Sequence, residues 1–189
     1  LLNRFTAAGF NAIDTADSYS HWAPGLSGGE SETVMGKWLA RRGRRDDVVI
    51  MTKVGSMPGR KGLSASNIAA AVEDSLRRLQ TDYLDVYFAH IDDDKVPLEE
   101  TLEAFSRLVD AGKVRTMGAS NYNAGRLRDA PDMVEHQPAL PLEGLAILAS
   151  LRVGALDAPR PDEVSDPAGS RNRILVAEAL HVDALPRHG

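Results

Sequence analysis

The sequence predicts an α/β fold whose parallel sheet closes as a TIM-type barrel, and three observations support this. Segments with strand character alternate with segments of helical periodicity, which is typical of a parallel sheet with helical crossovers. The polar residues of interest follow the carboxyl ends of successive strands, where a TIM-type barrel carries its active site. A doubly wound sheet would place a glycine-rich turn after its first strand, and the segment DTAD over residues 14–17 is not one.

The first part of the chain is predicted to form two helices and two strands, and each strand ends at a polar residue of interest. Apolar positions 1, 2, 5 and 8 share one helical face, and Gly9 is a natural helix end. A short apolar strand follows and ends at Asp14. Residues 30–42 form an amphipathic helix, and a continuous apolar run over residues 48–51 predicts a strand that ends at Thr52 and Lys53. The buried side of the helix is expected to hold Val34, Met35, Trp38 and Leu39.

The alternation continues through the rest of the chain. Ser64 or Ser66 caps a helix with positions 68, 72, 76 and 79 inside. Pro97 opens the next helix, which ends before Gly112. The strands around these helices cover residues 84–89 and 114–119, and His90, Ser120 and Asn121 follow them. Beyond these we expect a short helix over residues 123–129, a fifth strand ending at Gln137 and a candidate sixth ending at Ser150.

Composition limits the class of protein. The 189 residues suit one domain, and 43% apolar content is enough to bury a core. A net charge of −5 gives no basic surface for nucleic acid. The sequence has no cysteine, so disulfides and thiolate sites are excluded, as suits a reducing, cytoplasmic location. No apolar run is long enough to cross a bilayer, and we expect no membrane partner and no metal.

Four residues at three successive strand ends suggest a site for carbonyl reduction. A carboxylate such as Asp14 beside a buried strand needs a partner, and Lys53 can supply the cation. The ammonium is expected to lower the pKa of Tyr19, which then gives a proton to a carbonyl oxygen as negative charge develops. His90 holds that oxygen or assists the transfer. The reaction also needs a hydride, which implies a nicotinamide cofactor.

Each residue also has an ordinary structural explanation. Asp14 can cap a turn, Lys53 can extend from a strand end to solvent, His90 can be a core histidine and Tyr19 a loop aromatic. Taken singly these explanations are better, and it is the four together that favour a site. Trp22 lines a substrate pocket or only pins its loop, with equal weight. The glycines at positions 25, 28 and 29 are a weak phosphate-loop signal, because no Lys-Ser or Lys-Thr follows them.

Five segments give the chain a specific resemblance to the aldo-keto reductases: GFNAIDTADSY, GGESETVMGKWL, DDVVIMTKVG, TDYLDVYFAHIDDD and PLEETLEAFSRLVDAGKVRTMGASNY. The resemblance implies a (β/α)8 barrel and reduction of aldehydes or ketones by hydride transfer from NADPH. The GGESE loop is most similar to the branch that includes bacterial general reductases and potassium-channel β subunits. On matching positions Tyr19 would be the acid, Asp14, Lys53 and His90 would complete a tetrad, and Ser120, Asn121, Gln137 and Ser150 would contact the cofactor.

The chain also departs from the family pattern. From the resemblance we expect the family's N-terminal hairpin, first strand, last strand and adenosine-phosphate loop to be absent from these 189 residues. Only residues 137–144 separate the fifth and sixth strands, whereas a parallel crossover needs about a dozen residues. We therefore expect a single domain over residues 1–189, with the match strongest over 1–137 and divergent over 138–189. This would be an incomplete TIM-type barrel of about five to six parallel strands, truncated, weakly active or inactive, and prone to self-association through open sheet edges.

Two alternatives to a reductase of small carbonyl compounds stay open. The first is a non-catalytic regulatory protein that binds a nicotinamide cofactor, as the similarity to channel β subunits suggests. The second is a lyase that forms a Schiff base on Lys53, which the spacing of Asp14 and Tyr19 disfavours. The sequence does not specify the carbonyl substrate.

Overall fold

A computed structural model describes residues 1–122 of the chain. The predictions that concern residues 123–189, including the fifth and sixth strands and the cofactor contacts of Gln137 and Ser150, lie outside the described residues.

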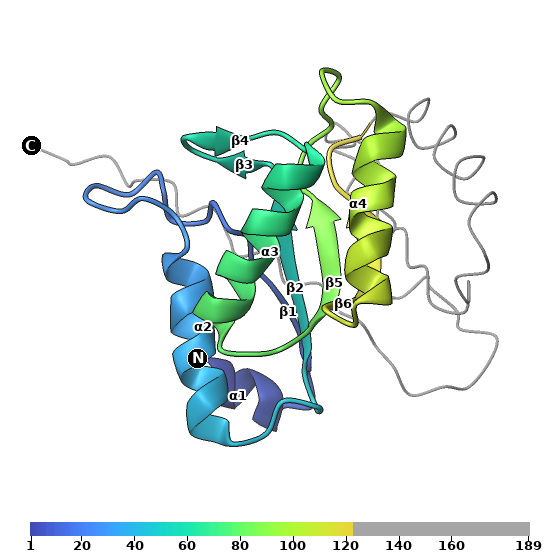
Figure 1. The fold of residues 1–189 in the computed structure, drawn as a ribbon. Coiled ribbons are helices and arrows are strands. Elements are labelled where there is room, and N and C mark those ends of the chain that lie inside the picture. The colour runs from blue at the N-terminus through green and yellow to red at the C-terminus, as the bar shows by residue number, and fades with distance from the viewer. Residues whose placement is uncertain (123–189) are drawn as a thin grey trace, which may run out of the picture.

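A parallel four-stranded sheet is the centre of the described part (Figure 1). Its strands are β1 (Ala12–Asp14), β2 (Val49–Val54), β5 (Leu84–Ala89) and β6 (Val114–Ala119), and they lie side by side in that order. Every neighbouring pair is parallel, so all carboxyl ends lie at one end of the sheet. Strand order follows chain order without reversal, as in a barrel wall. The predicted parallel α/β fold is confirmed, with an arrangement consistent with an incomplete TIM-type barrel.

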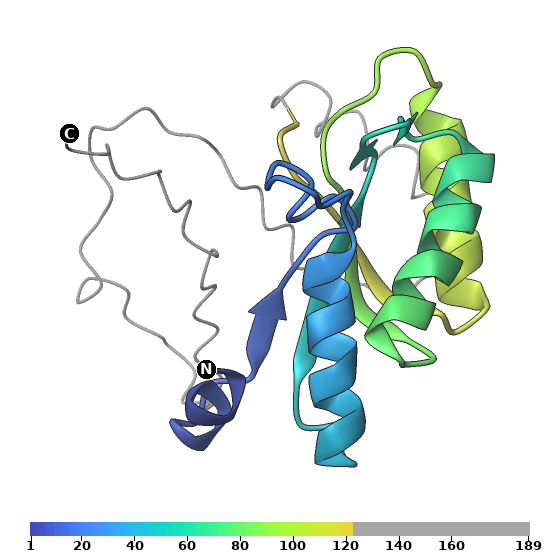
Figure 2. The same cartoon turned by 90° about the vertical axis from the view of Figure 1, so that its left-hand side faces the viewer.

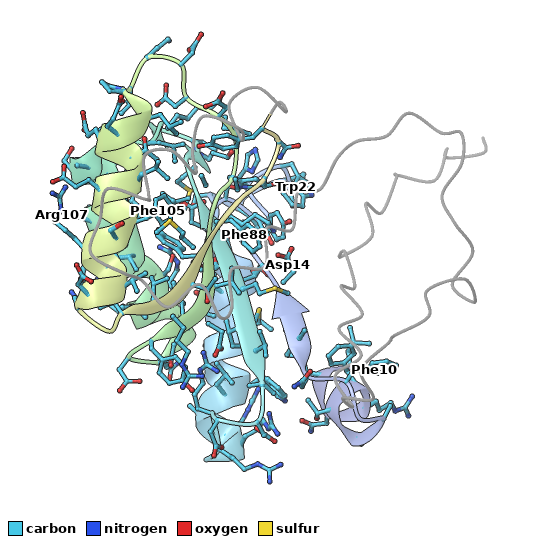
Figure 3. All side chains as sticks on the ribbon, turned by 90° about the vertical axis from the view of Figure 1, so that its right-hand side faces the viewer. Phe10, Asp14, Trp22, Phe88, Phe105 and Arg107 are labelled. Atoms are coloured by element: carbon cyan, nitrogen blue, oxygen red, sulfur yellow. The ribbon has the colours of Figure 1, made fainter. Side chains whose placement is uncertain are left out.

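Three helices cover one face of this sheet. These are α2 (Glu30–Arg42), α3 (Ala65–Leu79) and α4 (Leu98–Asp110), and Figure 2 shows them on the same side of the strands. The short helix α1 (Leu2–Ala7) lies near the start of β1. Figure 3 places Phe105 between α4 and the sheet, whereas Asp14 and Phe88 lie on the opposite sheet face. The sheet therefore separates a helix-covered side from the side that carries Asp14.

The main core lies between the helices and the sheet. Ile68, Val72 and Leu79 of α3 are fully buried there, together with Ile50 and Tyr87 from the strands. This confirms the inner face that periodicity predicts for α3.

For α2 the predicted face was wrong in one position. Val34 is 61% exposed, while Met35, Trp38 and Leu39 are buried as expected. The helix turns Gly36 toward α3 instead, where an added Cβ would lie 2.1 Å from the carbonyl oxygen of Arg78. This close approach of the two backbones sets the rotation of α2.

Local signals explain most of the helix ends. The Ser64 hydroxyl caps α3 by accepting a hydrogen bond from the Asn67 amide at 3.3 Å, so the first of the two candidate caps is the one used. Pro97 precedes the first residue of α4.

A small antiparallel hairpin of β3 (Ser56–Met57) and β4 (Arg60–Lys61) was not predicted, although the Pro58-Gly59 pair between its strands is a turn signal. Over residues 1–122, no helix has the length and apolar character that crossing a membrane requires.

Candidate active site

Three neighbouring strands bring the predicted site residues together at their carboxyl ends. Asp14 ends β1, Lys53 lies near the end of β2, and His90 directly follows β5. Backbone hydrogen bonds continue beyond the strands, from the Asp17 amide to the Lys53 carbonyl at 3.1 Å and from the His90 amide to the Val54 carbonyl at 2.9 Å. The loop that carries Tyr19 is therefore attached to the strand that carries Lys53.

The Lys53 ammonium is the centre of the group. Its Nζ atom lies 2.5 Å from Asp14 Oδ2, 2.8 Å from the Tyr19 hydroxyl and 3.1 Å from the Thr15 carbonyl oxygen. An ammonium has three N–H donors, so these three acceptors match its capacity. The Lys53 and Asp14 side chains are only 10% and 9% exposed. The pairing of Asp14 with a cation, which the sequence required, is present.

The pKa of Tyr19 is raised, and the sequence-based expectation of a lowered pKa was wrong. Burial is the largest cause and disfavours the phenolate, and the nearby Asp14 carboxylate acts in the same direction. The hydrogen bond and charge of Lys53 do lower the pKa, but they do not outweigh burial. A phenol is already neutral at physiological pH without any shift, and the Tyr19 hydroxyl donates to Asp14 Oδ2 at 3.3 Å.

His90 is a neutral imidazole beside this group. Burial, and then the charge of Lys53, lower the pKa of His90 to about 4. Its Nδ1 lies 3.5 Å from the Ser18 hydroxyl, and its ring meets the Tyr19 ring edge-on with centroids 5.9 Å apart. Such a group can donate a hydrogen bond at neutral pH, but it carries no extra proton to transfer.

Trp22 lies on the loop above the site, and Figure 3 shows it at the same end of the sheet as Asp14. Its ring is edge-on to both Tyr19, at 5.9 Å, and His21, at 5.3 Å. The residue is 64% exposed, so much of its aromatic surface is free to contact another molecule. Its role as a substrate contact stays a prediction.

Ser120 and Asn121 follow β6 and lie next to His90. The Asn121 side-chain amide donates to the His90 carbonyl at 2.8 Å and to the Ser120 hydroxyl at 3.0 Å. Asn121 adopts a left-handed backbone conformation, with φ 57°, which asparagine tolerates better than most residues. The turn therefore holds two predicted cofactor contacts at the edge of the site.

Three buried polar residues were not predicted from the sequence. Glu32, Thr52 and Asp17 are all 0% exposed. The Glu32 carboxylate accepts hydrogen bonds from the Thr52 hydroxyl and from Arg78. Periodicity could have found Glu32, because it lies three, four and seven positions before Met35, Gly36 and Leu39 on the inner face of α2. No sequence signal distinguishes Asp17 from an ordinary loop aspartate.

A carboxylate, an ammonium and a phenol gathered at the strand ends of a parallel sheet are typical of a barrel-type protein with an acid–base site. The sequence model of the Aldo/keto reductase family matches residues 1–142. The chain belongs to this family, as its motifs indicated.

Individual relatives agree with this membership. The chain is 40% identical to the aldo-keto reductase YhdN of Bacillus subtilis (strain 168) over 119 residues, which is 61% of this chain and 34% of that protein. It is 36% identical to a probable voltage-gated potassium channel subunit beta of Oryza sativa subsp. japonica over 69% of this chain and 39% of that protein. The chain thus spans a little over a third of the length of these two relatives.

The fold is also similar to a crystal structure of an aldo-keto reductase from Klebsiella pneumoniae in complex with NADPH. The TM-score is 0.57 at 39% sequence identity, and the match covers 67% of this chain and 40% of that one.

Proposed function

We propose that this protein reduces small aldehydes or ketones to alcohols with NADPH, and that Tyr19 is the general acid. The observation that carries the proposal is the contact of one ammonium, Lys53, with both the Asp14 carboxylate and the Tyr19 hydroxyl. A phenol in this position can donate a proton, and a cation next to it stabilises the phenolate that remains.

The roles of the protein residues follow from their electrostatics. An ordinary phenol is already protonated at neutral pH, and burial raises the pKa of Tyr19 further. Tyr19 releases the proton only when a carbonyl oxygen in front of it becomes basic, at which stage Lys53 at 2.8 Å offsets the new negative charge. Asp14 orients Lys53 through the 2.5 Å contact. Neutral His90 would donate a hydrogen bond to the same carbonyl oxygen.

The described site residues fit a nicotinamide cofactor. They include a proton donor but no hydride donor, and a bound NADPH would supply the hydride to the carbonyl carbon. Asn121 and Ser120, whose side chains are hydrogen-bonded to each other at 3.0 Å beside His90, are polar groups of the kind that a carboxamide contacts. Gln137 and Ser150 are proposed as further contacts on the family resemblance. The NADPH complex of the Klebsiella pneumoniae relative supports this choice of cofactor.

The chemistry of Lys53 disfavours the Schiff-base alternative. Its three N–H bonds are engaged by Asp14, Tyr19 and Thr15, whereas an amine nucleophile needs a free electron pair. A non-catalytic regulator that binds the cofactor is the second candidate, and the similarity to a potassium channel subunit beta favours it. Turnover of a carbonyl substrate separates that candidate from a reductase.

Substitution of the acid tests the proposal. NADPH oxidation by the full chain is followed with a reactive aromatic aldehyde, and Tyr19→Phe is expected to lower the rate about 100- to 10,000-fold. NADPH affinity, measured by fluorescence, should stay nearly unchanged because the phenol acts on the carbonyl oxygen. Tyr83→Phe is the matched control, since this phenol lies under Arg45 and Arg115 away from the site. More than a tenth of the wild-type rate in Tyr19→Phe would refute the assignment, and NADPH binding without turnover in the wild type would favour the regulator.

A further inference from the structure

We propose that Glu32 is a positioning residue for Lys53, acting across the sheet from the helix-covered side. The role as part of a reductase depends on the proposed function. The placement of Lys53 is a separate, geometric claim that can be measured without turnover.

Glu32 is a buried ion whose two carboxylate oxygens hold two different elements. Oε1 accepts a 2.6 Å hydrogen bond from the Thr52 hydroxyl of β2, and Oε2 accepts a 2.6 Å hydrogen bond from Arg78 Nε of α3. Glu32 is 0% exposed, and the Arg78 side chain is 20% exposed. Buried ion pairs are weak evidence for stability, because well-packed apolar residues often do as well. The two short hydrogen bonds of Glu32, each to a different element, therefore need an explanation other than stability.

Thr52 links Glu32 to Lys53 through the alternation of a strand. Neighbouring residues in a strand point to opposite faces. Thr52, held by Glu32 on the helix-covered side, is followed by Lys53, whose ammonium meets Asp14 and Tyr19 at the other face. A fixed Thr52 side chain limits rotation of β2 at this point, and so limits the directions that Lys53 can take.

The residue next to Glu32 makes a second connection to the site. The Ser31 hydroxyl lies 2.8 Å from the Thr15 hydroxyl. Thr15 directly follows Asp14, and its carbonyl oxygen accepts one of the three Lys53 hydrogen bonds. Consecutive residues in the first turn of α2 thus hold the chain on both sides of the Lys53–Asp14 contact, which a purely structural ion pair does not require.

His90 provides a readout of where Lys53 lies. The Lys53 charge is one of two causes that lower the His90 pKa. If Lys53 loses its position, its flexible stem carries the ammonium toward solvent, and the His90 pKa rises. Removing the negative charge of Glu32 would by itself lower the His90 pKa. The two effects have opposite signs, so the direction of the shift separates positioning from simple charge loss.

The experiment is an NMR titration of histidine-labelled full chain, with the His90 signal assigned by its loss in His90→Gln. Thr52→Val removes the hydroxyl that Glu32 binds, at similar volume and with no change of charge, and Glu32→Gln removes the charge. Both variants are expected to raise the His90 pKa by about half a unit or more. If Glu32→Gln does not fold, Thr52→Val still decides the question.

Asp85→Asn is the matched control. It breaks the Arg45–Asp85 ion pair, whose side chains are 18% and 10% exposed, at the opposite end of the sheet. It should reduce the unfolding free energy and leave the His90 pKa unchanged. An unchanged or lowered His90 pKa in Thr52→Val, or an equal rise in Asp85→Asn, would overturn the proposal. A rise of the His90 pKa in Thr52→Val and Glu32→Gln, but not in Asp85→Asn, supports the proposal. It does so even if the wild type is inactive as a reductase, because inactivity would refute only the reductase function.

Discussion

Replacing Asp17 by asparagine is expected to stabilise the protein at neutral and alkaline pH. Asp17 is 0% exposed, and within residues 1–122 neither of its carboxyl oxygens has a hydrogen-bond partner of normal geometry. Burial, and then the neighbouring Glu32, raise the pKa of this carboxyl to about 7, although Arg78 and Arg60 act in the opposite direction. The charged form of Asp17 is therefore unfavourable in the folded state.

The magnitude follows from the shift in pKa. An ordinary aspartate has a pKa of 3.8, so a folded-state value of about 7 is a rise of about 3 units. At 1.36 kcal/mol per unit, the cost of ionising Asp17 in the folded protein is about 4 kcal/mol. Between pH 4 and pH 7 the folded state keeps a proton that the unfolded state has released, so stability falls as pH rises through this window. The full cost is present above pH 7.

Urea unfolding followed by circular dichroism, at a series of pH values from about 4 to 8, measures the effect. An asparagine side chain cannot ionise, so the Asp17→Asn variant should match the wild type near pH 4 and exceed it by up to about 4 kcal/mol at pH 8. Because the variant and the wild type are compared at the same pH, the contributions of His90 and other titrating groups to the unfolding free energy cancel. Asp85→Asn is the contrasting control, because that carboxylate is paired with Arg45 and Arg115 and its loss should destabilise. A variant less stable than the wild type at pH 8, or an advantage that does not change with pH, would refute the reasoning.

Three further predictions concern packing, capping and electrostatics. Gly36→Ala should lower the unfolding free energy by about 1–3 kcal/mol or more, because the new Cβ would lie 2.1 Å from a carbonyl oxygen of α3; urea unfolding with little loss would show that α2 can move aside. Ser64→Ala should cost about 0.5–2 kcal/mol through the lost α3 cap, whereas Ser66→Ala should have a much smaller effect in the same assay. Lys53→Met should raise the His90 pKa measured by NMR, since one of its two lowering causes is removed. A value that stays near 4 would show that burial alone sets it.

Local patterns were enough to predict the helices and the strands of the parallel sheet over residues 1–122, and the approximate site, but not the β3–β4 hairpin. The apolar run before Lys53 and the end signals around residues 64–112 correspond to β2, α3 and α4. Because parallel strands place their carboxyl ends at one edge, the meeting of Asp14, Lys53 and His90 was also predictable. In the structure the Lys53 ammonium contacts both the Asp14 carboxylate and the Tyr19 hydroxyl.

The sequence by itself determined the order of the elements, the faces that most of them bury and the residue types that meet at the strand ends, since periodicity and chain order are local properties. Only the tertiary structure decided the exact rotation of α2, which exposes Val34, because the close approach at Gly36 involves a helix distant in sequence. It also decided the signs of the Tyr19 and Asp17 pKa shifts. Those signs depend on how completely each group is removed from water, and that removal results from residues far away along the chain packing around it.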